Sequence, residues 1–183
     1  MLLRISLALS VVACTAPIDP IDIPGGVPTG GVVVAVDCTS NGGLAETAVD
    51  ELWLRFEDVL VFHEDKGWLT IGGERQDINL NTLIEGDPVV SGAADVYEGP
   101  YNTVRVIVAD SWVVVNGAEQ NLSIERILDL PGDGFDFGAD FSVDVAMITT
   151  VTLVWNLDTE LTETAGEWSL GTTVAVDVAV AAI

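Results

Sequence analysis

Acidic residues recur between Asp129 and Asp144, and clusters of carboxylates are the usual ligands of calcium. The acids concerned are Asp129, Asp133, Asp136, Asp140 and Asp144. The last three recur every four residues along an expected strand, where such positions lie roughly 13 Å apart, too far to share one ion. A calcium site is therefore possible only around the Pro131-Gly132 turn, from Asp129, Asp133 and Asp136. A solvated acidic face is the better interpretation, and we assign no metal and no cofactor.

Residues able to act as nucleophile and base are scarce. His63 is the single histidine of the chain and the only base available to Cys38. Cys38 follows the apolar run 32–36, so we interpret it as a small hydrophobic residue near a strand end. His63 stands where a strand enters a turn, and we expect it to be exposed. Because no zinc-protease helix motif, phosphate-binding loop or nucleophile elbow is present, we predict that the protein is not an enzyme and has no catalytic residues.

Cys14 is expected to carry a lipid. Arg4 precedes an apolar run that closes on small residues, which is the order of an export signal. The end of this run, Val11-Val12-Ala13-Cys14, resembles a bacterial lipobox, in which the signal peptide is removed before a cysteine that is then acylated. Residues 1–13 would be the lipoprotein signal peptide, and the chain would be exported and anchored in the cell envelope, at the outer membrane. The alternative is an ordinary secretory signal, which leaves Cys14 free to pair with Cys38.

The charge balance narrows the range of partners. The chain has 29 acidic residues against 6 basic ones, a formal charge of −23. Such a surface repels phosphate backbones, so we expect no nucleic-acid partner. Hydrophobic residues make up 49% of the 183 residues, enough for one domain with a core. Residues 14–30 are rich in proline and glycine and are predicted to form a tether, which leaves 31–183 as the folded domain.

A period of two in hydrophobicity predicts strands throughout the domain. In the run 51–63, one face would hold Leu52, Leu54, Phe56, Leu60 and Phe62, and the other face Arg55, Glu57 and His63. The run 135–145 alternates more strictly, and so does the run 174–181. Further strands are expected at 32–37, 68–71, 101–109, 112–115, 120–124 and 149–155, with a hairpin turn at Asn116-Gly117 and a short helix or turn at 78–84. This number of short strands predicts an all-β fold, an antiparallel β-sandwich of about eight or more strands with little helix.

Tryptophans offer two interpretations. Trp53 falls opposite the apolar face of the run 51–63, and Trp68, Trp112 and Trp168 stand beside expected turns. Such rings could form a platform for sugar rings, or they could fill the ends of the sandwich, which we favour. Two coplanar, exposed rings would indicate a carbohydrate-binding module.

The order of these runs resembles domain-of-unknown-function family 4382, found in bacterial and archaeal surface lipoproteins. The stretches that carry the resemblance are 49–54 with 59–63, 67–70, 76–80, 97–106 and 153–178. The resemblance implies a β-sandwich in a cell-surface setting and supplies no site residue. We therefore expect a non-enzymatic surface lipoprotein with a binding or structural module, whose partner would be a surface protein or a glycan. The alternative is a secreted or periplasmic domain that binds calcium or a glycan.

Overall fold

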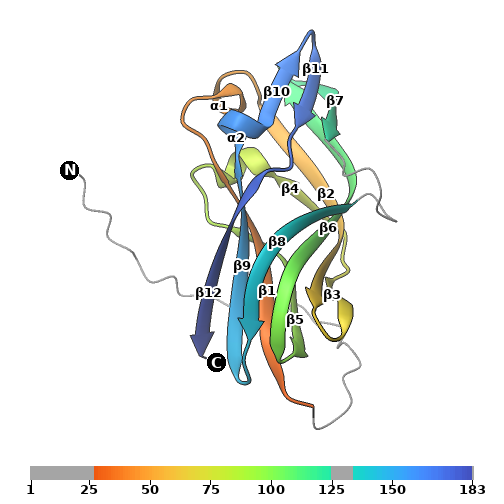
Figure 1. The fold of residues 1–183 in the computed structure, drawn as a ribbon. Helices are drawn as coiled ribbons and strands as arrows, with labels where there is room; N and C mark the ends of the chain where they lie inside the picture. The colour runs from red at the N-terminus through yellow and green to blue at the C-terminus, as the bar shows by residue number, and fades with distance from the viewer. Residues whose placement is uncertain (1–26, 125–133, 183) are drawn as a thin grey trace, which may run out of the picture.

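The computed structural model describes residues 27–124 and 134–182, which form two packed β-sheets (Figure 1). The smaller sheet has the order β12 (Val174–Ala182), β9 (Met147–Asn156), β1 (Thr29–Thr39) and β5 (Val89–Tyr97). The larger sheet has the order β10 (Leu161–Thr164), β11 (Glu167–Leu170), β7 (Ala118–Ile124), β6 (Gly99–Val115), β2 (Glu51–His63) and β3 (Gly67–Gly72). Its other two strands are β4 (Gln76–Asn79), which pairs with β2, and β8 (Gly134–Val143), which pairs with β6. The predicted all-β sandwich is confirmed.

Two strand pairs differ from the antiparallel pattern that the sequence predicts. β1 pairs with β9 in parallel, and β11 pairs with β7 in parallel. Parallel pairs need long connections, and periodicity within a strand says nothing about the direction of its neighbour. Thr29 and Gly30, expected in the tether, already pair with Tyr97 and Val96 as part of β1.

Little of the described chain is helical. The short elements are α1 (Leu44–Thr47), the 3₁₀ helix η1 (Leu80–Leu83) and α2 (Leu157–Glu160). The expected helix or turn at 78–84 corresponds to the end of β4 followed by η1. In the part of the chain that the structure describes, no helix is long and apolar enough to cross a membrane.

The core lies between the inner faces of the two sheets. In β8 the alternation is confirmed, because Phe135, Phe137, Ala139, Phe141 and Val143 are all buried. The Phe137 ring meets the buried Trp155 of β9 edge to face, at 5.5 Å between centroids. These contacts join the larger sheet to the smaller one.

The face assignment for the second half of β2 is wrong. Phe56 pairs with Val108 of β6 while Asp58 pairs with Ile107, so Glu57 is an extra residue, a β-bulge. One inserted residue moves every later side chain to the opposite face. Val59 and Val61 are therefore buried, while Leu60 and Phe62 lie on the outer face.

The same shift turns His63 inward, contrary to the expectation that it is exposed. His63 is only 3% exposed, with its Nε2–H donating to the Glu98 carbonyl at 3.0 Å and its Nδ1 accepting from the Asp65 amide at 3.0 Å. It lies where β5 leaves one sheet and β6 enters the other. There the Tyr101 hydroxyl donates to the Tyr97 carbonyl at 2.8 Å, a bond that fixes this corner between the sheets.

Candidate functional site

The basic residues of the described chain belong to neighbouring segments of the larger sheet. Arg55 is on β2, Lys66 in the turn that leads to β3, Arg75 directly before β4, and Arg105 on β6. These four are all the lysines and arginines in the ranges 27–124 and 134–182. Since β3, β4 and β6 all pair with β2, these four cations lie on β2, on a strand paired with it or directly beside such a strand.

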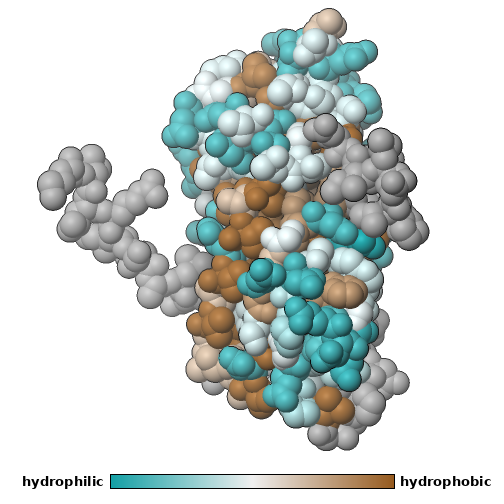
Figure 2. All heavy atoms as spheres, in the orientation of Figure 1, coloured by the Kyte–Doolittle hydropathy of each residue, from teal (hydrophilic) through white to brown (hydrophobic). Residues whose placement is uncertain are grey.

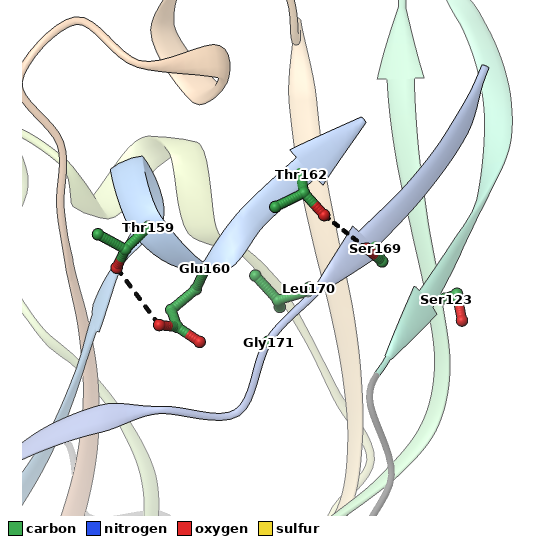
Figure 3. Close-up of a pocket in the computed structure, with 7 residues that line it drawn as sticks. All are labelled: Ser123, Thr159, Glu160, Thr162, Ser169, Leu170 and Gly171. Atoms are coloured by element: carbon green, nitrogen blue, oxygen red, sulfur yellow. Dashed lines mark hydrogen bonds between the residues drawn. The ribbon is translucent and has the colours of Figure 1, made fainter. Parts of the chain in front are cut away.

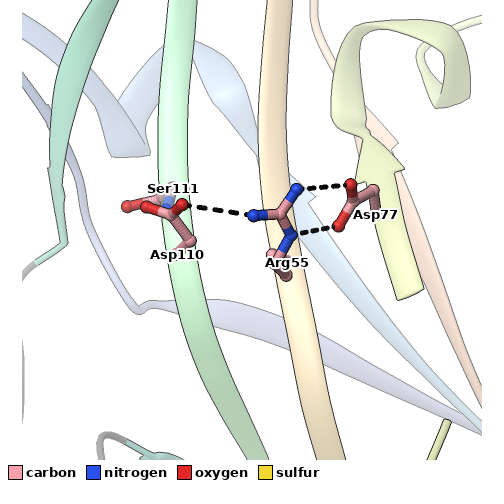
Figure 4. A network of polar contacts seen from close by, with 4 residues as sticks. All are labelled: Arg55, Asp77, Asp110 and Ser111. Atoms are coloured by element: carbon pink, nitrogen blue, oxygen red, sulfur yellow. Dashed lines mark hydrogen bonds and ion pairs between the residues drawn. The ribbon is translucent and has the colours of Figure 1, made fainter. Parts of the chain in front are cut away.

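Arg55 is held between two carboxylates on the outer face of the larger sheet (Figure 4). Its Nε and Nη2 donate to the two oxygens of Asp77 at 2.6 and 2.8 Å, and its Nη1 reaches Asp110 at 3.4 Å. Asp77 of β4 and Asp110 of β6 are the direct cross-strand neighbours of Arg55. The hydrogen bond from Arg55 lowers the pKa of Asp77, which keeps this carboxylate ionised.

Aromatic rings flank the same arginine. Trp53 and Trp112 are direct cross-strand partners, and their rings stack with centroids 5.7 Å apart and planes 11° from parallel. The Arg55 guanidinium lies 5.0 Å from the centre of the Trp112 ring, within cation–π range. The Trp53 indole N–H donates to Glu51 at 2.7 Å. Trp112, Arg55 and Asp77 therefore form a fixed unit on the sheet surface.

A second unit of the same composition lies further along β6. Arg105 donates through Nε and Nη2 to both oxygens of Asp136 on β8, at 2.6 and 2.8 Å. Its guanidinium lies 4.0 Å from the centre of the Trp68 ring on β3. Phe62 meets that ring edge to face at 5.1 Å. The Arg105 side chain is 12% exposed, whereas Trp68 is 36% exposed and offers part of its ring to solvent.

We call the two units together the outer-face strip. It consists of Trp53, Arg55, Asp77, Trp112, Phe62, Trp68, Arg105 and Asp136. Asp110, which faces Arg55, is five residues from Arg105 on β6, so the units lie roughly 15 Å apart. Both units lie on the outer face because β2 and β6 each have a bulge between them. Glu57 is the extra residue in β2, and Ala109, which has no partner in β2, is the extra residue in β6.

The family is established by a comparison of the sequence with family models. Residues 43–170 match the model described as Domain of unknown function (DUF4382), which covers more than half of the chain. The chain belongs to this family. No curated protein and no solved structure matches it.

The DUF4382 match covers only part of the sandwich. It runs from just before α1 to the end of β11 and includes every residue of the outer-face strip. β1 and β12, two of the four strands of the smaller sheet, lie outside the matched range. The strip is thus built entirely from the part of the chain that defines this DUF4382 domain.

The tryptophans were expected either to fill the ends of the sandwich or to form a platform for sugar rings, and the structure places them differently from one another. Trp168 is buried at 6% exposure, and its indole N–H donates to Gln120 at 3.1 Å, as expected for a ring that fills the sandwich. Trp53 and Trp112 are parallel but half-buried, and they stack on each other rather than lying side by side. Neither original interpretation describes this pair, because the rings stand on the outside of the sheet with only part of their surface open.

The arginines of the strip were not singled out from the sequence. A signal for them exists, since arginine is scarce in this chain and both residues fall within expected strands. The pairing of Arg55 with Trp112 and Asp77 joins three strands, however, and depends on the register that the bulges set. Periodicity within one strand does not reveal it.

Other candidate residues are placed as follows. Cys38 is a free thiol at 2% exposure, and burial raises its pKa far above the ordinary value, so the reactive thiolate is disfavoured. It lies in the smaller sheet, whereas His63 lies in the larger one. Cys14, Asp129 and Asp133 lie outside the described residues, and Asp136 is paired with Arg105. Within 27–124 and 134–182, no group of three or more His, Cys, Asp or Glu residues is arranged to hold a metal ion.

A shallow hollow of about 400 Å³ lies at the end of the sandwich that carries β10 and β11 (Figure 3). Its lining is Ser123, Thr159, Glu160, Thr162, Ser169, Leu170 and Gly171. Glu160, its single charged group, accepts hydrogen bonds from the Thr159 hydroxyl at 3.3 Å and the Thr173 amide at 3.1 Å. The hydroxyls of Thr162 and Ser169 bond to each other at 2.7 Å. Glu160 holds the loop at Thr173, and Thr162 and Ser169 bond to each other across β10 and β11, so the outer-face strip is the stronger candidate site.

Proposed function

We propose that this protein is an exported, lipid-anchored protein of the cell envelope whose sandwich is a non-catalytic binding module. The outer-face strip is its binding surface. The proposal rests on one arrangement that occurs at two places on the same sheet face. In each, an arginine guanidinium lies over a tryptophan ring and donates two hydrogen bonds to one carboxylate. Because these half-exposed side chains are already held rigid, binding a ligand does not cost the conformational entropy of ordering them.

A neutral, hydroxyl-rich ligand fits this surface best. Both guanidinium charges are already matched by Asp77 and Asp136, so the strip lacks the free positive charge that an anionic ligand requires. The charge of −23 on the chain also repels anions. Indole edges and faces pack against the apolar faces of sugar rings, and carboxylates bind hydroxyls. Two units roughly 15 Å apart favour an extended ligand, so we assign the strip to a glycan chain.

The anchor part of the proposal rests on the sequence around Cys14. A lipid on this residue, followed by the stretch rich in proline and glycine, would hold the sandwich near a membrane while leaving the strip free to face outward. Mass spectrometry of the intact, membrane-extracted chain should show a polypeptide that begins at Cys14 and carries an acyl-glyceryl group. A soluble chain that begins elsewhere, or a Cys14→Ala variant that stays on the membrane, would contradict the anchor.

Binding is tested with the full chain on a panel of neutral and acidic glycans, by calorimetry and by thermal shift. We expect a neutral glycan to bind, and Trp68→Ala to weaken binding at least about tenfold, the cost of one aromatic contact. Val90→Ala is the matched control, since Val90 is exposed on the smaller sheet. Absence of binding across the panel, or equal effects of the two variants, would refute the strip as a glycan site.

A further inference from the structure

The free edges of the two sheets are protected to different degrees. β5, at one edge of the smaller sheet, lies against β3, since a Cβ placed on Gly72 would come within 2.8 Å of the Ser91 carbonyl oxygen. In the larger sheet, β10 is only four residues long, and β8 presents the acids Asp136 and Asp140. Short strands, covering segments and charges are the means by which proteins prevent an edge from pairing with another chain. β12, the other edge of the smaller sheet, is nine residues long, carries a single acid and pairs with no described strand on its outer side.

β12 is long, apolar and exposed. Its nine residues read VAVDVAVAA and contain one charged residue, Asp177. Val174 and Val176 pack against the core, whereas Val178 and Val180, two and four residues further on the same face, are 43% and 51% exposed. One side of β12 pairs with β9, and no described strand pairs with the other side. Figure 2 shows apolar residues gathered along this margin of the molecule, over β12 as placed in Figure 1.

We propose that β12 pairs antiparallel with β12 of a second copy of this chain. A two-fold axis perpendicular to the sheet and through Val178 joins the two smaller sheets into one sheet of eight strands. In that register Val178 faces its own counterpart, and the outer β12 edges of both copies are satisfied at once. About eight to ten backbone hydrogen bonds form along two strands of this length.

The side chains of β12 suit this self-pairing. With Val178 at the axis, Val176 faces Val180 of the second copy, so a ladder of valines covers the exposed inner-face positions. Asp177 faces Ala179 of the second copy rather than its own counterpart. The two Asp177 side chains are then diagonal neighbours roughly 7–8 Å apart, where solvent and salt weaken their repulsion.

A second copy fits this edge better than a partner of opposite charge. With a single acid, β12 offers little for a basic strand to recognise, although the remainder of the chain is strongly acidic. Two such chains repel least where their surfaces carry least charge, and β12 is such a place. Pairing about a two-fold axis also closes, so it produces a dimer rather than a fibre.

The size of the contact predicts a weak dimer. A strand of nine residues is about 30 Å long, and a sheet edge about 10 Å thick buries roughly 300 Å² on each partner. The total is well below the roughly 1,600 Å² of a standard stable interface. Reversible pairing that high salt strengthens is therefore expected, and covalent trapping is the suitable assay.

Cysteine cross-linking of the full chain, in its membrane or in mild detergent, tests the pairing and its register. Directly opposite residues have Cα atoms about 4.5–5.5 Å apart, which suits a disulfide. Val178→Cys should give at least about tenfold more oxidised dimer than the wild-type chain. Ala175→Cys and Ala181→Cys should each give only the wild-type background, because each residue lies about 20 Å from its own counterpart. A mixture of these two variants should cross-link, since Ala175 faces Ala181 of the second copy.

Charged substitutions at Val178, the residue on the two-fold axis, give a second and independent test of the dimer. Val178→Glu and Val178→Lys should each remove the dimer seen for the wild type in sedimentation velocity at 0.5 M salt. Mixing the two variants should restore it, since opposite charges then face each other. Val90→Glu, at an exposed valine of β5, is the matched control and should leave the dimer unchanged. A wild-type chain that stays monomeric at millimolar concentration, cross-linking that is equal at 175 and 178, or pairing only with another protein would each overturn the proposal.

Discussion

Substitution of Gly99 by alanine tests the corner between β5 and β6. Gly99 has φ of +128°, a conformation that costs a residue with a side chain about 1–3 kcal/mol. A Cβ there would lie 2.9 Å from His63 Nε2, so the imidazole must move away from the Glu98 carbonyl that it binds at 3.0 Å. Loss of a hydrogen bond at this buried histidine adds about 1–3 kcal/mol. The sum, about 4 kcal/mol, is a large part of the stability of an ordinary domain.

Urea unfolding of the full chain, followed by tryptophan fluorescence, measures this cost against two other glycines. Gly117 has φ of +72° with open space around its Cβ position, so Gly117→Ala should cost only the backbone strain, about 1–2 kcal/mol. Gly138 has open space and no positive φ, and Gly138→Ala should change stability by less than about 0.5 kcal/mol. If Gly99→Ala costs no more than Gly117→Ala, the contact with His63 does not constrain the corner and the reasoning fails.

Three further predictions concern the core, the acids and the response to salt. Phe137→Ala should lower the free energy of unfolding by about 3–5 kcal/mol, and Asp140→Asn by less than about 0.5 kcal/mol; equal effects in urea unfolding would contradict the observed faces of β8. Burial, and after it two nearby carboxylates, raises the pKa of Asp37 above its ordinary 3.8, so the folded state binds this proton more tightly than the unfolded state does. The resulting stabilisation is fully present below the unfolded pKa and is lost as pH rises through the folded pKa. Asp37→Asn should therefore gain stability over the wild type between about pH 4 and 7, and a difference that does not change with pH would argue against this. Sodium and calcium chloride of equal ionic strength should raise the melting temperature equally, with no effect of EDTA, because screening of the acidic surface is the cause. A calcium-specific, saturable rise would instead reveal a metal site.

The sequence predicted strands well where one face of a strand is continuously buried. β8 is the clearest case, since every second residue from Phe135 to Val143 is apolar and buried. The Asn116-Gly117 turn was also predictable, because both residues adopt positive φ, 51° and 72°, as the tight hairpin between β6 and β7 requires. In these elements local conformation and burial follow from the same few residues.

The errors have physical reasons too. Asp58 interrupts the apolar face predicted for 51–63, but apolar residues occupy both faces after it, and only the partner strand shows that Glu57 is the extra residue. β6 was expected as two strands, 101–109 and 112–115, since Asp110 and Ser111 interrupt its pattern, yet it is one strand with a bulge at Ala109. β4, β5, β10 and β11 were not predicted; β5 is largely small residues, and the other three have only four residues each. Side chains that meet across strands, such as Arg105 and Asp136, depend on register and could not be read from one strand.

The position of β1 has a consequence for the order of folding. β1 is the first strand of the described residues, yet it lies inside the smaller sheet, between β5 and the late strand β9. Its parallel pairing with β9 must wait until nearly the whole domain has been synthesised, and contacts so distant along the chain slow folding. The smaller sheet therefore closes only after β9 has been synthesised. Until β9 has been synthesised, β5 is the one described strand with which β1 can pair in this sheet.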